Sequence, residues 1–178
     1  MIKEIKIDYD LDVFLKADYS VHKGSCISHQ VNELQDIHET YGWSNTYNSN
    51  NTIIRQLWFD KSQVDYVVLG QQLNMEVLTV SSILQPPGNT IPIQRDTFYQ
   101  INKKFPQDER LKIRANIYLK DWKVGEILQY EKNKQWYNST HWSAGDGFIW
   151  DSSHLHLSAN NGMQNKYTLQ VSGFLNES

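Results

Sequence analysis

Several features are scarce in this sequence, and each absence excludes a class of protein. The chain has 178 residues but one cysteine, Cys26, which excludes an intramolecular disulfide framework and any zinc site built from paired thiolates. No apolar run approaches the roughly 18–20 residues of a membrane span, so we expect no membrane partner. The opening stretch, MIKEIKIDYDLDVF, lacks the apolar segment of a signal peptide, so we expect a cytoplasmic protein.

Net charge is scarce as well. Lysine and arginine number 17 and aspartate and glutamate 20, which gives a net charge of −3. This balance argues against a surface made mainly to bind nucleic-acid phosphates. With 39% hydrophobic and 21% charged residues, the composition is typical of a globular chain. We find no internal repeat and no linker rich in proline or glycine, so we expect a single domain over residues 1–178.

The N-terminal portion, residues 1–74, is predicted to be mixed and largely helical. Apolar residues alternate over 5–9 as in a strand. They recur at helical spacing over 31–37 and again over 64–68, where Asp60 begins a sequence that resembles a capping box. We therefore expect these helices to pack on the outside of a sheet formed by the remainder of the chain.

The rest of the chain predicts short strands. The stretch 75–84 is rich in β-branched residues and ends at the turn Pro86-Pro87-Gly88-Asn89. Segments 113–119 and 166–171 alternate between an apolar and a polar face, and Gly145-Asp146-Gly147 reads as a hairpin turn. Short strands with frequent turns favour an antiparallel sandwich or barrel, and with the helices they give an α+β fold.

The alternating segments leave one question open. Arg114, Asn116 and Tyr118 share the polar face of the first segment, and Lys166 lies on the polar face of the second. These faces either point into a barrel whose interior suits a charged ligand, or they face solvent while the apolar faces form the core. Alternation alone does not separate the two arrangements.

Two other segments carry candidate metal ligands. In IPIQRDTFY, Gln94 and Asp96 lie two residues apart and share a strand face, and His154 and His156 do the same in WDSSHLHLSANN. Histidine and carboxylate ligands that leave open coordination positions suit non-haem Fe(II). Spacing of this kind is a weak signal, because a polar strand face more often simply meets solvent.

The order of four motifs resembles the Fe(II)/2-oxoglutarate-dependent oxygenases. The motifs are QPPGNTIPIQRD, RANIYLKDWKVGEI, HWSAGDGFIWDSSHLHLSANN and KYTLQVSGF. The likeness is closest to small members related to the aspartyl/asparaginyl β-hydroxylases and the prolyl hydroxylases. It implies a double-stranded β-helix, a cupin-like jelly-roll barrel, over residues 75–174, flanked by N-terminal helices.

The resemblance also implies roles for individual residues. Asp96 matches the carboxylate ligand of Fe(II), and His156 matches the distal histidine. Lys166 sits where the family holds the far carboxylate of 2-oxoglutarate, and Arg114 matches an arginine that also contacts this co-substrate. A positively charged hydrogen-bond donor stabilises a carboxylate that has been transferred from water into a protein interior. The implied activity is hydroxylation of a small-molecule, peptide or protein substrate, with release of succinate and CO2.

Gln94 departs from the family pattern, which has a histidine as the first metal ligand. An amide oxygen is a poorer partner for Fe(II) than an imidazole nitrogen. Three outcomes follow. Gln94 coordinates the metal weakly, or His154 or His141 supplies the missing nitrogen, or the site has lost iron chemistry and the barrel binds a ligand or a protein partner.

Two further candidates find less support. Cys26 lies near His29, but a small free cysteine near the start of a helix is more often a packing residue than a nucleophile. Ser152 and Ser153 precede His154 without the strained Gly-x-Ser-x-Gly turn that exposes a nucleophilic serine.

Overall fold

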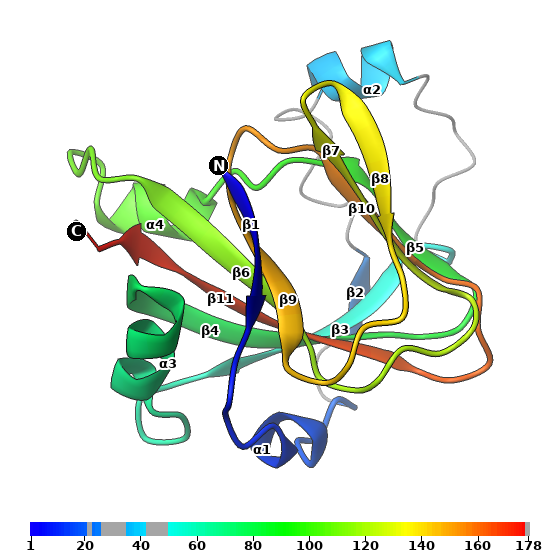
Figure 1. The fold of residues 1–178 in the computed structure, drawn as a ribbon, viewed down its shortest axis with the longest axis horizontal. Helices are drawn as coiled ribbons and strands as arrows, with labels where there is room; N and C mark the ends of the chain where they lie inside the picture. Colours follow the sequence, from blue (N-terminus) through cyan, green and yellow to red (C-terminus); the bar gives the residue numbers. More distant parts are fainter. Residues whose placement is uncertain (21–22, 26–34, 42–49, 177–178) are drawn as a thin grey trace.

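The computed structural model describes residues 1–20, 23–25, 35–41 and 50–176. Within these residues, the strands form a seven-stranded and a four-stranded sheet (Figure 1). Neighbouring strands are antiparallel in every described pair. Two opposed antiparallel sheets with few helices form a double-stranded β-helix, the fold that the sequence predicts.

The larger sheet has the spatial order β1 (Ile2–Lys6), β9 (Asp146–Asp151), β6 (Lys112–Tyr118), β11 (Lys166–Leu175), β4 (Met75–Gln85), β3 (Ile53–Phe59) and β2 (Lys23–Ser25). The smaller sheet has the order β5 (Asn89–Gln94), β10 (His156–Asn160), β7 (Glu126–Lys132) and β8 (Gln135–Ser139). The described helices are α1 (Asp12–Leu15), α2 (Gln35–Thr40), α3 (Tyr66–Leu73) and α4 (Tyr99–Lys104).

The outer face of the larger sheet forms the main hydrophobic core under α1 and α3. Apolar side chains from β6 and β11 pack there against Phe14 of α1 and Leu69 of α3. The strand residues are Ile113, Ala115, Ile117, Leu169 and Val171. All are fully buried, and burying a valine, leucine or isoleucine side chain stabilises the fold by about 1.5–3 kcal/mol. The prediction that helices cover one side of the sheet is confirmed.

The opposite face of the larger sheet looks toward the smaller sheet. Tyr118 of β6 and Trp150 of β9 pack against Leu128 of β7, which belongs to the smaller sheet. Because residues two apart on a strand share a face, Arg114 and Asn116 lie on the same inner side as Tyr118. The polar face of this segment therefore points into the barrel, and the apolar face forms the core beneath the helices.

Helix α3 begins later than the capping box suggests. Asp65 is its N-cap, and its carboxylate accepts hydrogen bonds from the backbone N–H groups of Val67 and Val68. Asp60 and Gln63 instead close the preceding turn, in which the Gln63 side chain accepts from the Asp60 N–H.

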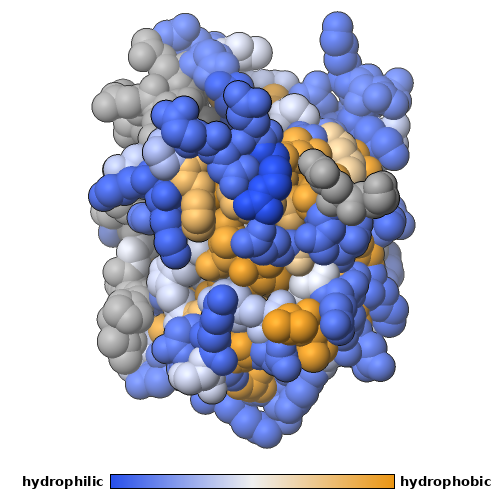
Figure 2. Space-filling view, turned by 90° about the vertical axis from the view of Figure 1, so that its left-hand side faces the viewer, coloured by the Kyte–Doolittle hydropathy of each residue, from blue (hydrophilic) through white to orange (hydrophobic). Residues whose placement is uncertain are grey.

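Seen from the side that carries α3 and α4, the surface is mainly hydrophilic with separate hydrophobic patches (Figure 2).

The Gly145 turn does not close a hairpin. The preceding strand, β8, belongs to the smaller sheet, whereas β9 after the turn belongs to the larger one, so this turn carries the chain between sheets. Gly145 has a φ of +86°, and a Cβ atom there would lie 2.7 Å from the Ile7 carbonyl oxygen. A side chain at this position would be strained, which accounts for the glycine.

The larger sheet extends beyond residues 75–174. Strand β1 pairs with β9 and strand β3 pairs with β4, so the N-terminal portion supplies edge strands as well as helices. These pairings join residues far apart in sequence, which a local pattern does not reveal. Most of the helix expected over 31–37 lies outside the described residues. None of the described helices is long and apolar enough to cross a membrane.

Candidate functional site

One end of the smaller sheet brings Gln94 and His156 face to face. His156, the first residue of β10, pairs in register with Gln94 of β5 and with Tyr130 of β7. Directly paired residues point to the same side of a sheet, so all three side chains share its inner face. The amide nitrogen of Gln94 lies 3.5 Å from Nε2 of His156. A half-turn of that amide exchanges its nitrogen and oxygen at this position.

Asp96 enters the same space just beyond the end of β5. Its neighbour Arg95 points away, toward Asp36 of α2, while the Asp96 carboxylate is buried and accepts a hydrogen bond from Nε1 of Trp150 at 2.7 Å. The Trp150 ring lies 4.5 Å from the His156 ring, centroid to centroid. Trp150 therefore contacts both residues and holds the carboxylate near the imidazole.

Arg114 makes an ion pair with the second oxygen of Asp96. Its Nη1 donates a short hydrogen bond to Oδ1, and its Nε donates to Oγ of Ser172 at 2.9 Å. The guanidinium also lies 5.5 Å from the centroid of the Phe98 ring. Asp96 thus has one cationic and one neutral donor, which orient both of its oxygens.

His156 is held in the form that binds metals. Burial lowers its pKa, although the nearby charge of Asp96 opposes the shift. A neutral imidazole is the form of histidine that coordinates a metal. The backbone oxygen of His154 lies 3.3 Å from Nδ1 of His156, so a proton on Nδ1 would leave Nε2 toward Gln94 as the free acceptor.

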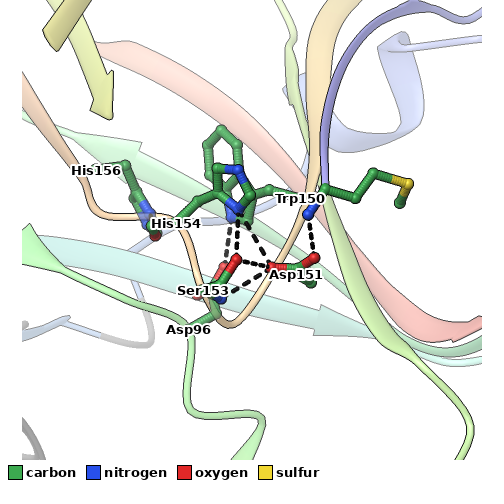
Figure 3. Close-up of polar contacts among 7 residues, drawn as sticks. Asp96, Trp150, Asp151, Ser153, His154 and His156 are labelled. Atoms are coloured by element: carbon green, nitrogen blue, oxygen red, sulfur yellow. Dashed lines mark hydrogen bonds and ion pairs between the residues drawn. The ribbon is translucent and has the colours of Figure 1, made fainter. Parts of the chain in front are cut away.

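His154 does not join this group, contrary to the shared strand face expected from the sequence. Strand β10 begins at His156, so His154 lies in the preceding turn. Its Nδ1 is 3.2 Å from Oδ1 of Asp151 and 3.0 Å from Oγ of Ser153. Figure 3 shows His154 directed at this pair, while Trp150 reaches Asp96.

His141 is also placed elsewhere. It lies on the exposed loop before β9, where its ring packs 4.3 Å from that of Trp122. Among the described residues, no three histidine, cysteine, aspartate or glutamate side chains gather as a possible metal site. Among the described residues, the side chain beside His156 at this end is therefore the Gln94 amide and not a further histidine.

Lys166 is buried in the barrel at the start of β11. Its Nζ donates to the carbonyl oxygen of Ile127 at 2.6 Å and to Oγ of Ser158 at 2.8 Å, and it lies 5.3 Å from the centroid of the Trp142 ring. It makes no ion pair with any described residue. Burial lowers the pKa of Lys166 to about 7, even though the charge of Glu126 opposes this shift. The ammonium therefore lacks a carboxylate at contact distance.

Asn116 presents an unpaired donor on the wall between these two ends. Its oxygen accepts a hydrogen bond from Nε2 of Gln170 at 3.0 Å, but its own Nδ2 is buried without a partner among the described residues. A buried donor left without an acceptor costs about 1–3 kcal/mol. The described residues therefore supply no acceptor for this donor.

Three residues of this interior did not emerge as site residues from the sequence. Trp150 and Ser172 contact Asp96 and Arg114 respectively, and Ser158 binds Lys166. Ser172 continues the two-residue alternation that begins at Lys166, so periodicity was the signal for it. Trp150 carried no such signal, because its role depends on a partner 54 residues away.

No protein-family model and no curated protein matches the chain. Solved structures do resemble it. A prolyl-4-hydroxylase from Pseudomonas putida is 16% identical with a TM-score of 0.54, over 99% of this chain and 92% of that one. The non-heme alpha-ketoglutarate-dependent carbocyclase SnoK from nogalamycin biosynthesis is 11% identical with a TM-score of 0.59, over 97% and 79%.

The epimerase SnoN, described as non-heme and alpha-ketoglutarate dependent and from the same biosynthesis, is 8% identical with a TM-score of 0.50. It matches over 84% of this chain and 75% of that one. At these identities the likeness is one of fold, and it agrees with the double-stranded β-helix described above. What the chain does has to be argued from its own site.

Proposed function

We propose that this protein is a non-haem Fe(II)- and 2-oxoglutarate-dependent oxygenase, a hydroxylase that acts on a small-molecule, peptide or protein substrate. The proposal rests on two groups of side chains inside one barrel, one that suits a metal and one that suits an anion. Asp96 and His156, two residues of types that can bind a metal, both contact Trp150, and a buried lysine without a carboxylate partner among the described residues lies at Lys166. A 2-oxo dicarboxylic acid bound to a metal would complete both.

The side chains at the first end fit a divalent metal. Asp96 offers carboxylate oxygens, His156 an imidazole nitrogen and Gln94 an amide oxygen. Two ligands on adjacent positions of an octahedral metal lie about 3 Å apart, given bonds of about 2.1 Å. The 3.5 Å between the Gln94 amide and His156 Nε2 is close to that spacing. Such a metal would supply the activation of oxygen, and three ligands leave positions for the co-substrate.

The distance between the two ends suits a five-carbon dicarboxylate. Ser158, which binds Lys166, lies two residues along β10 from His156, or about 6–7 Å on the same strand face. An acid that holds the metal by its 2-oxo end therefore reaches Lys166 with its far carboxylate. Asn116 lies on the opposite wall between the two, where its unpaired Nδ2 can donate to an oxygen of the acid.

The chain's own residues bind and orient rather than react. Trp150 fixes the Asp96 carboxylate, and the 2.6–2.8 Å hydrogen bonds of Lys166 fix its ammonium before a ligand arrives. Phe148 and Tyr130 pack between the sheets, with ring centroids 4.9 Å apart, and exclude water from that side. This preorganisation favours one orientation of the acid and limits side reactions.

Anaerobic titration of the protein with Fe(II) and 2-oxoglutarate tests the proposal. A bound chelate gives a visible metal-to-ligand absorption band, and admission of oxygen with the right substrate then yields succinate. The band should appear in the wild-type protein and should not form with glutarate, which lacks the 2-oxo group. Absence of the band at millimolar iron would contradict the oxygenase proposal and leave a ligand- or protein-binding barrel.

A further inference from the structure

The end of the barrel around Asp96 is electrically balanced before any metal binds. Gln94 carries no charge, and the single negative charge of Asp96 is matched by the positive charge of Arg114. The Asp96 side chain is 3% exposed and that of Arg114 21%, so solvent screens the pair weakly. A divalent cation that bound there alone would leave two uncompensated positive charges.

Arg114 is held so that it stays at the site. Its Nε donates to Ser172 at 2.9 Å, and its guanidinium packs 5.5 Å from the centroid of the Phe98 ring. Ser172 and Arg114 are paired in register on neighbouring strands, so both belong to the rigid larger sheet. The guanidinium therefore remains within a few ångströms of any metal held by Asp96, and at that range two like charges repel strongly in a partly buried site.

A dianion supplies the missing negative charge. The two carboxylates of a 2-oxo dicarboxylic acid add two negative charges, which balance those of the metal. Among the described residues, Nη2 of Arg114 has no hydrogen-bond partner, and Nδ2 of Asn116, on the same strand face, has none either. Both are donors that a carboxylate accepts from, so the acid also relieves their lack of partners.

We infer that Arg114 makes metal binding at Asp96 and His156 conditional on the dianionic co-substrate. The inference rests on the proposed function and adds its regulation. The metal binds weakly alone and tightly as a pair with the acid. By linkage, the acid gains affinity from the metal by the same factor. Arg114 is thus a positioning residue that competes with the metal for Asp96 until the acid arrives.

Binding of Mn(II), followed by its electron paramagnetic resonance signal, tests this without any turnover. In the wild-type protein, 2-oxoglutarate should raise the affinity for Mn(II) by about 10- to 100-fold. Glutarate carries the same two charges but cannot chelate through a 2-oxo group, and it should still raise the affinity several-fold. No effect of glutarate would mean that simple chelation accounts for the coupling and would overturn the inference.

Variants at position 114 make the test specific. Arg114→Gln should bind Mn(II) alone about tenfold or more tightly than the wild type, and its coupling to glutarate should vanish. Arg114→Lys keeps the charge and should behave like the wild type. Arg110→Gln is the matched control, because Arg110 pairs with Glu76 and Asp108 at the surface and the substitution changes the net charge equally.

Each outcome has a distinct meaning. Unchanged or weaker Mn(II) binding by Arg114→Gln, in a variant whose circular dichroism spectrum shows that it is folded at the assay temperature, would overturn the inference while leaving the oxygenase proposal intact. If Arg114→Gln does not fold, the glutarate comparison in the wild type decides. If Mn(II) fails to bind the wild type at millimolar concentration even with 2-oxoglutarate, the proposed function itself is wrong.

Discussion

At one end of the barrel interior a carboxylate and a guanidinium are paired, whereas at the other a buried ammonium has no carboxylate partner among the described residues. Asp96 and Arg114 satisfy one another and are further held by Trp150 and Ser172. Lys166 has only neutral acceptors, on Ile127 and Ser158.

The difference shows at which end the charges are balanced before a ligand binds. A paired buried charge contributes to the fold itself, whereas an unpaired one weakens the fold until an anion binds. The Asp96 pair therefore stabilises the fold before any ligand binds, whereas the charge of Lys166 is paired when an anion binds. Substitutions at the two ends should separate stability from affinity.

The largest effect is expected for Asp96→Asn. It leaves the Arg114 guanidinium half-buried beside a neutral amide, and breaking a buried pair in this way destabilises a protein by about 3–5 kcal/mol. Urea denaturation measures the free energy of unfolding. Asp146→Asn is the control, because its ion pair with Lys6 is well exposed and should be worth less than about 1 kcal/mol. Equal losses in the two variants would contradict a structural role for the Asp96 pair.

Lys166→Met should remove binding of the dicarboxylate instead. Loss of a buried charged donor weakens such a ligand by about 100-fold, or nearly 3 kcal/mol, while Mn(II) alone should bind within about threefold of the wild type. Equilibrium dialysis with labelled 2-oxoglutarate measures the first and paramagnetic resonance the second. Lys120→Met, at an exposed lysine over Tyr167, is the control. Equal loss of acid and metal affinity would show that Lys166 does not act on the acid alone.

The pH dependence of stability should carry the signature of Lys166. Its pKa is about 7 in the folded protein and near 10.5 when unfolded, so between these values the unfolded chain binds the extra proton. Stability attributable to Lys166 therefore rises with pH over this window, by at most about 1.4 kcal/mol per pH unit, and the cost of the buried charge is greatest below pH 7.

The difference between wild type and Lys166→Met isolates this effect from other titrating groups. The wild type should gain stability relative to the variant between pH 7 and pH 9.5, as followed by chemical denaturation at each pH. Saturating 2-oxoglutarate should flatten the gain, because the bound acid keeps the ammonium charged. A difference that does not change with pH would argue against a neutral lysine in the folded protein.

The smallest effect is expected for Gln94→His. An imidazole in place of the amide supplies the stronger nitrogen ligand, so the affinity for Mn(II) in the presence of 2-oxoglutarate should rise about tenfold, or 1.4 kcal/mol. Gln94→Ala serves as the control and should lower the affinity slightly. If neither change alters metal binding, Gln94 does not face the metal.

The strand pattern of the barrel was readable from the sequence because alternation has a local cause. The two-residue period of a strand predicts that Ile113 and Arg114 point to opposite faces of the sheet. In the structure these two residues of β6 do so. Strand β3 was not predicted, because IIRQLWF does not alternate and its partner β4 lies beyond a helix.

The site was readable only in part. Gln94, Asp96 and His156 come together as the motif order suggested, but the ion pair of Asp96 with Arg114 depends on how the two sheets stack, which no local pattern encodes. The error at His154 had a local cause. The Asp151 carboxylate accepts from the Ser153 N–H and bends the chain, a turn that Asp-Ser-Ser favours.

A crystal structure with Mn(II), a redox-inert substitute for iron, and N-oxalylglycine, an analogue of 2-oxoglutarate, tests the central claim most directly. We expect one metal ion held by Asp96, His156 and the Gln94 amide, with the far carboxylate of the analogue on Lys166 and Ser158. Metal-free crystals at millimolar Mn(II), or an analogue whose far carboxylate lies away from Lys166, would contradict it.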